Sequence, residues 1–182
     1  ATSGYRAQRF LVFLNPFAPE DYKYAGWQPA HSLLGLASGG LFGVGLGGSR
    51  QKWGNLAEAH TDFIFAVIGE EIGLLGTTIV LAAFFMIAWA GIKTAIATRD
   101  PFSRYAVAGI TVWIIAQASI NIGSVTGVFP VVGLPLPLVS YGGSALISSM
   151  VGLAFILGVA RREPEAKRYF DSRPKILEWR GR

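Results

Sequence analysis

The chain has 182 residues, of which 52% are hydrophobic and only 15% are charged, with a mean hydropathy of +0.44. Soluble domains carry about 25% charged residues, so this composition argues for a membrane protein. The net charge of +5 is confined to residues 1–71, 93–104 and 161–182, which indicates loops beside anionic lipid and no nucleic-acid partner, and the absence of cysteine excludes disulfides and thiolate metal sites.

Residues 1–63 contain no apolar run long enough to cross a bilayer. Pro16, Pro19 and Pro29 interrupt this segment, which is rich in the aromatic residues that favour membrane interfaces. Residues 6–14 fit a short interfacial helix. We therefore expect a large extracellular loop that contains short interfacial or re-entrant helices.

The segment 33–48 is rich in glycine, and Gly35, Gly39, Gly43 and Gly47 recur every four residues. On a helix this spacing leaves one bare stripe, where another backbone can approach closely. We expect a short re-entrant or surface helix that ends in a loop. The alternative is a flexible loop throughout, because so many glycines weaken a helix.

A basic spot follows at Arg50, Gln51 and Lys52. Cations close to a carboxylate suit a reaction that expels a phosphate-type leaving group. The alternative is a pair of solvated surface charges, which is the ordinary state of such residues.

Glu58, His60, Thr61 and Asp62 stand directly before the first long apolar run. Ionisable groups at a membrane edge cost free energy unless they face water, a partner or a substrate, so the cluster indicates a functional site. A carboxylate beside a histidine suits a general base, and Asp62 is our candidate. The alternative is that Thr61 or Asp62 is the N-cap of a helix that starts at Phe63.

Two further carboxylates, Glu70 and Glu71, begin the apolar run. They suit binding of a cation, pairing with basic residues or holding of a proton. Alternatively, they only favour the N-terminal end of the helix dipole.

Three apolar runs are long enough to cross a membrane, at about residues 72–97, 105–124 and 144–160. Arg99 and Arg104 follow the first run, and Arg161 opens a tail rich in Lys and Arg.

The positive-inside rule then places residues 98–104 and the tail 161–182 in the cytoplasm. Residues 1–63 and the uncharged loop 125–143 face outward. Asp62 and this loop are therefore expected on the same side, where they can build one site.

Gln117, Asn121 and Ser124 share one face of the second run. Buried amides in a membrane seek partners on other helices, so this face is more typical of helix packing than of a substrate site.

The segment 135–144 combines prolines and glycines with no charge. Non-helical backbone at membrane depth is tolerated only when it is buried in protein or lines a cavity. We expect a shaped re-entrant segment that leads into the third run, whose N-terminus favours an anion such as pyrophosphate. A plain extracellular turn is the alternative.

Three motifs resemble those of the bacterial SEDS family (shape, elongation, division and sporulation). They lie at residues 45–52 (GLGGSRQK), 58–73 (EAHTDFIFAVIGEEIG) and 133–144 (GLPLPLVSYGGS), in the family's order. The resemblance covers nearly the whole chain and is weakest after Lys167; residues 6–15 and 58–60 resemble the division-type members more than the elongation-type members. Leu56-Ala57 departs mildly from the Leu-Pro common in relatives.

The resemblance implies an all-α polytopic membrane protein. This chain would be its C-terminal portion, with three transmembrane helices and the large extracellular loop; the lack of an initiator Met or a signal-like run near Ala1 agrees with this.

SEDS proteins polymerise lipid II into glycan strands and work with a class B penicillin-binding protein that crosslinks them. The resemblance therefore implies a peptidoglycan glycosyltransferase in the bacterial cell membrane, acting in septal wall synthesis beside other divisome membrane proteins. A lipid II flippase and a division-complex scaffold are the alternatives.

Asp62 matches the key aspartate of the family's large loop. That match implies the catalytic base or the holder of a divalent cation, Mg²⁺ or Mn²⁺. We expect residues 137–144 to form a wall of the lipid-substrate cavity near Asp62, so that a bulky side chain at Gly142 or Gly143 would distort it. The expected substrate-binding residues are Arg50, Gln51, Lys52, Glu58, His60, Thr61, Pro137, Ser140, Tyr141, Gly142, Gly143 and Ser144.

Overall fold

The computed structural model describes residues 12, 15–19, 22, 26–53, 56 and 59–163. Within them every regular element is a helix: α2 (Trp27–Gly39), the short 3₁₀ helix η1 (Gln51–Trp53), α3 (Ile64–Ala97), α4 (Pro101–Val125) and α5 (Gly143–Arg162). The all-α prediction is confirmed. Nearly all of the predicted interfacial helix at residues 6–14, Glu58 and most of the tail lie outside the described residues.

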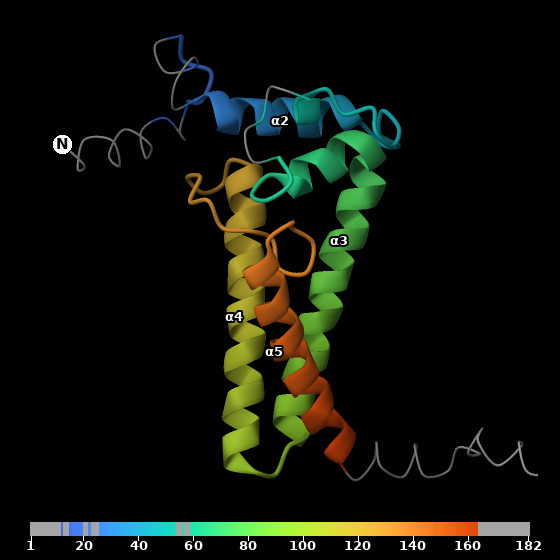
Figure 1. Cartoon of the computed structure of the whole chain (residues 1–182), viewed down its shortest axis with the longest axis vertical. Helices are drawn as coiled ribbons and strands as arrows, with labels where there is room; N and C mark the ends of the chain where they lie inside the picture. Colours follow the sequence, from blue (N-terminus) through green and yellow to red (C-terminus); the bar gives the residue numbers. More distant parts are fainter. Residues whose placement is uncertain are drawn as a thin grey trace, which may run out of the picture.

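Helices α3, α4 and α5 run alongside one another, and α2 lies across one end of this bundle (Figure 1). All three bundle helices are long and apolar enough to cross a membrane, with mean hydropathies of 2.2, 1.6 and 2.0. Large apolar side chains such as Trp89, Val112 and Leu157 are exposed on them, as expected of helices that meet lipid or further helices. The protein is a polytopic membrane protein, and the three predicted spans fall within α3, α4 and α5.

The two ends of the bundle differ. Helix α2 and the loop 126–142 lie at one end, whereas the turn between α3 and α4 lies at the other (Figure 1). The expectation that Asp62 and this loop share one end is therefore confirmed. Which end faces outward remains a prediction from the charge pattern.

A buried apolar core ties the α2 end together. Phe63 from the turn before α3 and Leu136 from the loop before α5 are 2% and 1% exposed, and both join the core formed by Ile114 and Ala118 of α4. Two segments far apart in the sequence are thus packed on the same helix. Burying side chains of this size contributes about 1.5–3 kcal/mol each.

Helix α3 is bent at Gly73, where φ is 75° and ψ is −158°. The helix starts at Ile64, earlier than the predicted start of the first span at residue 72. Residues 64–72 form a separate arm that lies near α2, and only the part after the bend runs down the bundle (Figure 1). A positive φ of this kind favours glycine.

The glycine-rich segment forms a helix that ends in a loop, as predicted, although α2 starts earlier, at Trp27. Gly39 ends α2, and Gly43 lies in the loop with a φ of 78°. A Cβ at Gly39 would overlap the backbone of Gly69, and a Cβ at Gly43 would overlap that of Glu71. The expected close backbone approach is therefore real, and its partner is the first arm of α3.

Four backbone hydrogen bonds join the loop to the bend in α3. The N–H groups of Val44 and Gly45 donate to the carbonyls of Glu70 (2.9 Å) and Glu71 (3.1 Å), while the N–H groups of Leu74 and Leu75 donate to the carbonyls of Gly40 (2.9 Å) and Leu41 (3.4 Å). The groups that the bend releases from α3 are thus satisfied by the loop, as buried backbone polar groups require.

Candidate active site

Asp62 lies in a turn whose backbone is held at three consecutive carbonyls. The carbonyl of His60 accepts from the N–H of Tyr141 (2.9 Å), that of Thr61 from the hydroxyl of Ser140 (2.5 Å), and that of Asp62 from the amide of Asn121 (2.8 Å). The donors come from the end of the loop 126–142 and from α4. The structure thus fixes the Asp62 turn against the loop that was expected beside it.

The loop itself is folded back onto α4. Ser124 donates to the carbonyl of Pro130 (3.1 Å), Gln117 to that of Pro135 (3.0 Å), and the N–H of Leu136 donates to the hydroxyl of Ser140 (2.7 Å). Pro137 is fully buried. The segment is therefore a packed structure and not a plain turn, and the polar face of α4 serves the loop backbone rather than another helix.

The Asp62 side chain is half-buried, and Gly133 lies beside it. A Cβ at Gly133 would stand 3.3 Å from the Oδ2 atom of Asp62, and Gly133 has a φ of 78°. His60 and Tyr141 are exposed around this position. A carboxylate that is partly shielded yet reachable is the arrangement that a general base requires.

The N-cap interpretation of Thr61 or Asp62 is wrong. Phe63 occupies the N-cap position of α3, with φ −113° and no capping hydrogen bond from its side chain. Phe63 instead anchors the turn by burial in the core. Asp62 is therefore placed one residue outside the helix.

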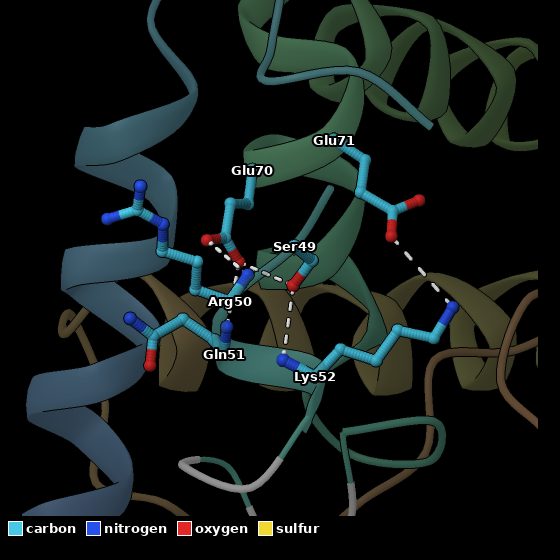
Figure 2. A network of polar contacts seen from close by, with 6 residues as sticks. All are labelled: Ser49, Arg50, Gln51, Lys52, Glu70 and Glu71. Atoms are coloured by element: carbon cyan, nitrogen blue, oxygen red, sulfur yellow. Dashed lines mark hydrogen bonds and ion pairs between the residues drawn. The ribbon is translucent and has the colours of Figure 1, made fainter. Parts of the chain in front are cut away.

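A second carboxylate organises the basic spot (Figure 2). The Glu70 side chain is 2% exposed and accepts from the hydroxyl of Ser49 (2.5 Å), the N–H of Arg50 (3.0 Å) and the N–H of Gln51 (3.4 Å). The Ser49 hydroxyl in turn accepts from the N–H of Lys52 at 3.1 Å. Because a carboxylate has only acceptors, it suits this set of converging donors. The structure thus gives Glu70 a structural role, which differs from the roles considered for it.

The two basic side chains of this loop point in opposite directions (Figure 2). The Lys52 ammonium lies 3.8 Å from Glu71 Oε1, so the predicted pairing with a basic residue is confirmed for Glu71. Arg50 is exposed and, with Gln51 and Glu70, lines a cavity of about 590 Å³ beside α2. Arg50 therefore remains the cation better placed to meet a ligand.

The predicted site residues fall into two groups. In the first group, the carbonyls of His60 and Thr61 accept hydrogen bonds from Tyr141 and Ser140, and Asp62 follows them in the same turn. Arg50, Gln51 and Lys52 are instead organised around Glu70 and Glu71. Pro137 is buried below the first group, and Gly142, Gly143 and Ser144 lead from it into α5.

Within the described part of the chain, no group of three or more His, Cys, Asp or Glu residues could hold a metal ion. Asp62 would offer a divalent cation one carboxylate. Mg²⁺ is commonly held by one or two carboxylates together with substrate phosphates and water, so Asp62 fits a site that the substrate completes.

The model of the cell cycle protein family FtsW/RodA/SpoVE matches residues 1–165. The chain belongs to this family. It is 44% identical over 158 residues to a probable peptidoglycan glycosyltransferase FtsW of Geobacter metallireducens, covering 87% of this chain and 42% of the relative. It is also 44% identical to stage V sporulation protein E of Bacillus subtilis, over 86% of this chain and 42% of that protein.

One solved structure of this fold, described as "Structural coordination of polymerization and crosslinking by a peptidoglycan synthase complex", contains a similar chain. The TM-score is 0.65 at 28% sequence identity, and the match covers 88% of this chain and 43% of that one. The chain thus spans about two fifths of the length of these FtsW/RodA/SpoVE relatives.

Three residues of this family member were missed as parts of the site. Gly133 was seen only within a motif, Asn121 was read as a helix-packing residue, and Glu70 had several possible roles. The spacing of Gln117, Asn121 and Ser124 was the available signal, because a polar face on an apolar helix must find partners. No pattern in the sequence identified the backbone N–H groups that Glu70 binds.

Proposed function

We propose that the intact protein is a peptidoglycan glycosyltransferase that polymerises lipid II into glycan strands during septal wall synthesis. The names of the FtsW relatives support the activity, and the three spans support a place in the cell membrane. One observation carries the proposal: Asp62 is a half-buried carboxylate whose turn is fixed through three backbone carbonyls at the same end of the bundle as α2 and the loop 126–142.

The reaction joins two lipid-linked saccharides. The 4-hydroxyl of the N-acetylglucosamine on the incoming lipid II attacks the anomeric carbon of the growing strand. Asp62 takes the hydroxyl proton as the new C–O bond forms, and the bond between the anomeric carbon and the pyrophosphate breaks. The electron pair leaves with undecaprenyl pyrophosphate. A positioned base of this kind contributes about 10²–10⁴-fold to a rate.

The leaving group carries negative charge and needs a cation or donors. Arg50 is exposed at the cavity beside α2, whereas Lys52 is paired with Glu71. We assign Arg50 the main role toward the pyrophosphate. Alternatively, Asp62 would hold Mg²⁺ or Mn²⁺ together with substrate oxygens, and the cation would neutralise part of this charge.

The partner we propose is a class B penicillin-binding protein, which would crosslink the new strands, within a division complex of further membrane proteins. The similar solved chain belongs to a complex described as coordinating polymerisation and crosslinking, which supports such a partner. The resemblance of residues 6–15 and 58–60 to division-type members supports the septum as the place of action.

The test is Asp62→Asn in the full-length protein, purified with its penicillin-binding partner and supplied with lipid II. We expect polymer synthesis to fall by about 10²-fold or more, since the amide cannot accept the proton, while membrane insertion and thermal stability stay near wild type. A variant that polymerises at the wild-type rate would refute Asp62 as the base. Absence of polymer from the wild-type protein would favour a flippase or a scaffold.

A further inference from the structure

Asn121 is a buried amide in the middle of the contacts around Asp62. It lies on α4, is 2% exposed, and its Nδ2 group donates to two carbonyls, those of Asp62 (2.8 Å) and Leu134 (2.5 Å). These acceptors belong to segments that approach α4 from different parts of the chain. One side chain therefore sets the spacing between them.

That spacing matters because of what lies beside each acceptor. Leu134 follows Gly133, whose Cα would direct a Cβ to 3.3 Å from the Asp62 carboxylate. Asn121 thus holds both the backbone of Asp62 and the loop segment that touches its side chain. Since α4 is a regular helix here, the Asn121 side-chain amide is a rigid reference point for the Asp62 turn and for the loop segment at Leu134.

The other end of the amide bears on what the N–H bonds do. Within the described residues, Asn121 Oδ1 is buried and has no hydrogen-bond partner. Burying an unpaired acceptor costs free energy, whereas an apolar side chain of the same size would take the donor away from the carbonyls of Asp62 and Leu134. An amide at this place is explained by what its two N–H bonds hold.

We propose that Asn121 is a positioning residue for Asp62: its amide sets the Asp62 carboxylate against Gly133 in the geometry needed for proton transfer. The inference rests on the proposed function. Displacing a reacting group by about 1 Å can cost on the order of 10²-fold in rate, so such a residue affects turnover without touching substrate.

Gln117 provides a matched control. It lies one turn earlier on the same face of α4, and its amide donates to the carbonyl of Pro135 at 3.0 Å. It therefore holds the same loop, but this bond does not reach the Asp62 turn. Replacing either amide by Leu removes a donor to the loop, from a buried side chain at Asn121 and from a half-buried one at Gln117, but only Asn121→Leu also removes the contact with Asp62.

The experiment compares Asn121→Leu, Gln117→Leu and Asp62→Asn in the full-length protein with its penicillin-binding partner, measuring kcat and KM for lipid II and thermal stability. We expect Asn121→Leu to lower kcat by about 10–100-fold with KM within about twofold, and Gln117→Leu to change kcat by less than about threefold. Asn121→Ser, which keeps one donor, should recover part of kcat.

Equal kcat values for the two Leu variants, or a wild-type kcat for Asn121→Leu, would overturn the inference. If Asn121→Leu does not fold, Asn121→Ser is compared with Gln117→Ser under the same criteria. The activity of Asp62→Asn tests the role of Asp62 separately from the role of Asn121. An active Asp62→Asn refutes Asp62 as the base, and absence of polymer from the wild-type protein refutes the proposed function. An inactive Asp62→Asn with equal Leu variants refutes only the role of Asn121.

Discussion

Asp62 and Glu70 are two carboxylates on neighbouring stretches of chain, and the structure treats them in opposite ways. At Asp62 the backbone carbonyl is bonded and the side chain remains half-buried beside Gly133. At Glu70 the side chain itself is buried and accepts from the loop that begins at Ser49.

The difference shows how a carboxylate becomes structural or reactive. Side-chain oxygens saturated by protein donors hold a fold together, and they are poorly placed to take a proton from a substrate. At Asp62 the bonds to α4 and to the loop hold the backbone of the turn, and the residue is only partly buried, so a substrate can reach it. The comparison predicts that removing Glu70 damages stability and removing Asp62 damages only turnover.

The largest expected effect comes from Glu70→Ala. It leaves the donors of Ser49, Arg50 and Gln51 without their acceptor, so the free energy of unfolding should fall by about 1–3 kcal/mol, and polymerisation should fall with it. Thermal denaturation in detergent and a lipid II assay measure the two effects. Glu71→Ala is the control, since its pair with Lys52 is worth about 0–1 kcal/mol. Equal stability of the two variants would break the comparison.

Gly133→Ala tests the reactive role of Asp62 in this comparison with Glu70. Its φ of 78° disfavours any side chain by about 1–2 kcal/mol, and the new Cβ would press on the Asp62 carboxylate. We expect a loss of kcat in the lipid II assay that exceeds the loss of stability.

The control for Gly133→Ala is Gly142→Ala. Gly142 has an extended φ of −150°, and its Cβ would meet only Ala145 at an ordinary 3.7 Å. Gly142 therefore has room for a methyl group that Gly133 lacks, while the expected sensitivity of Gly142 and Gly143 to a bulky side chain stays a prediction. A Gly142→Ala variant as impaired as Gly133→Ala would contradict this assignment.

The smallest effect is expected at the opposite end of the bundle. Asp100 caps α4 by accepting from the N–H of Ser103 at 2.8 Å. Hydrogen bonding by the Ser103 side chain, and to a smaller extent by its N–H, lowers the pKa of the exposed Asp100 carboxyl. A lowered pKa means that this stabilisation is present above the unfolded-state pKa and is lost as pH falls through the folded-state value.

Asp100→Ala should therefore lower the thermal midpoint slightly at neutral pH and leave polymerisation unchanged. The gap between wild type and variant should close below about pH 4, where the carboxyl is protonated. Asp100→Asn, which keeps a capping oxygen, should lie between them. A gap that persists at low pH would show that the cap does not act through its charge.

Much of the fold could be predicted because a membrane span is a local property. The length of an apolar run determines whether it crosses a bilayer, so the three spans were found with small shifts at their ends. The meeting of Asp62 with the loop 126–142 followed from charge-based topology. The helix within 33–48 was predicted because its glycines recur at a helical period.

The rest depended on contacts that leave no side-chain pattern. Glu70 binds backbone N–H groups of Arg50 and Gln51, which every residue but proline carries, and the bend at Gly73 depends on a loop far earlier in the chain. The N-cap interpretation was wrong because burial of Phe63 decided where the helix starts. Tertiary packing outweighed the local capping preference there.

At Gly73, helix α3 and the loop 40–45 exchange backbone hydrogen-bond partners. In an ordinary α-helix the carbonyl of one residue pairs with the N–H four residues later, as Glu70 with Leu74 and Glu71 with Leu75. In the loop, Gly40 and Val44 have the same spacing, and so do Leu41 and Gly45. Each segment gives the other the partners that it would otherwise use itself. Inserting or deleting one residue within 40–45 would shift the register of the loop against α3 and disturb all four hydrogen bonds. We therefore expect this segment to tolerate new side chains at its exposed tip far better than a change in length.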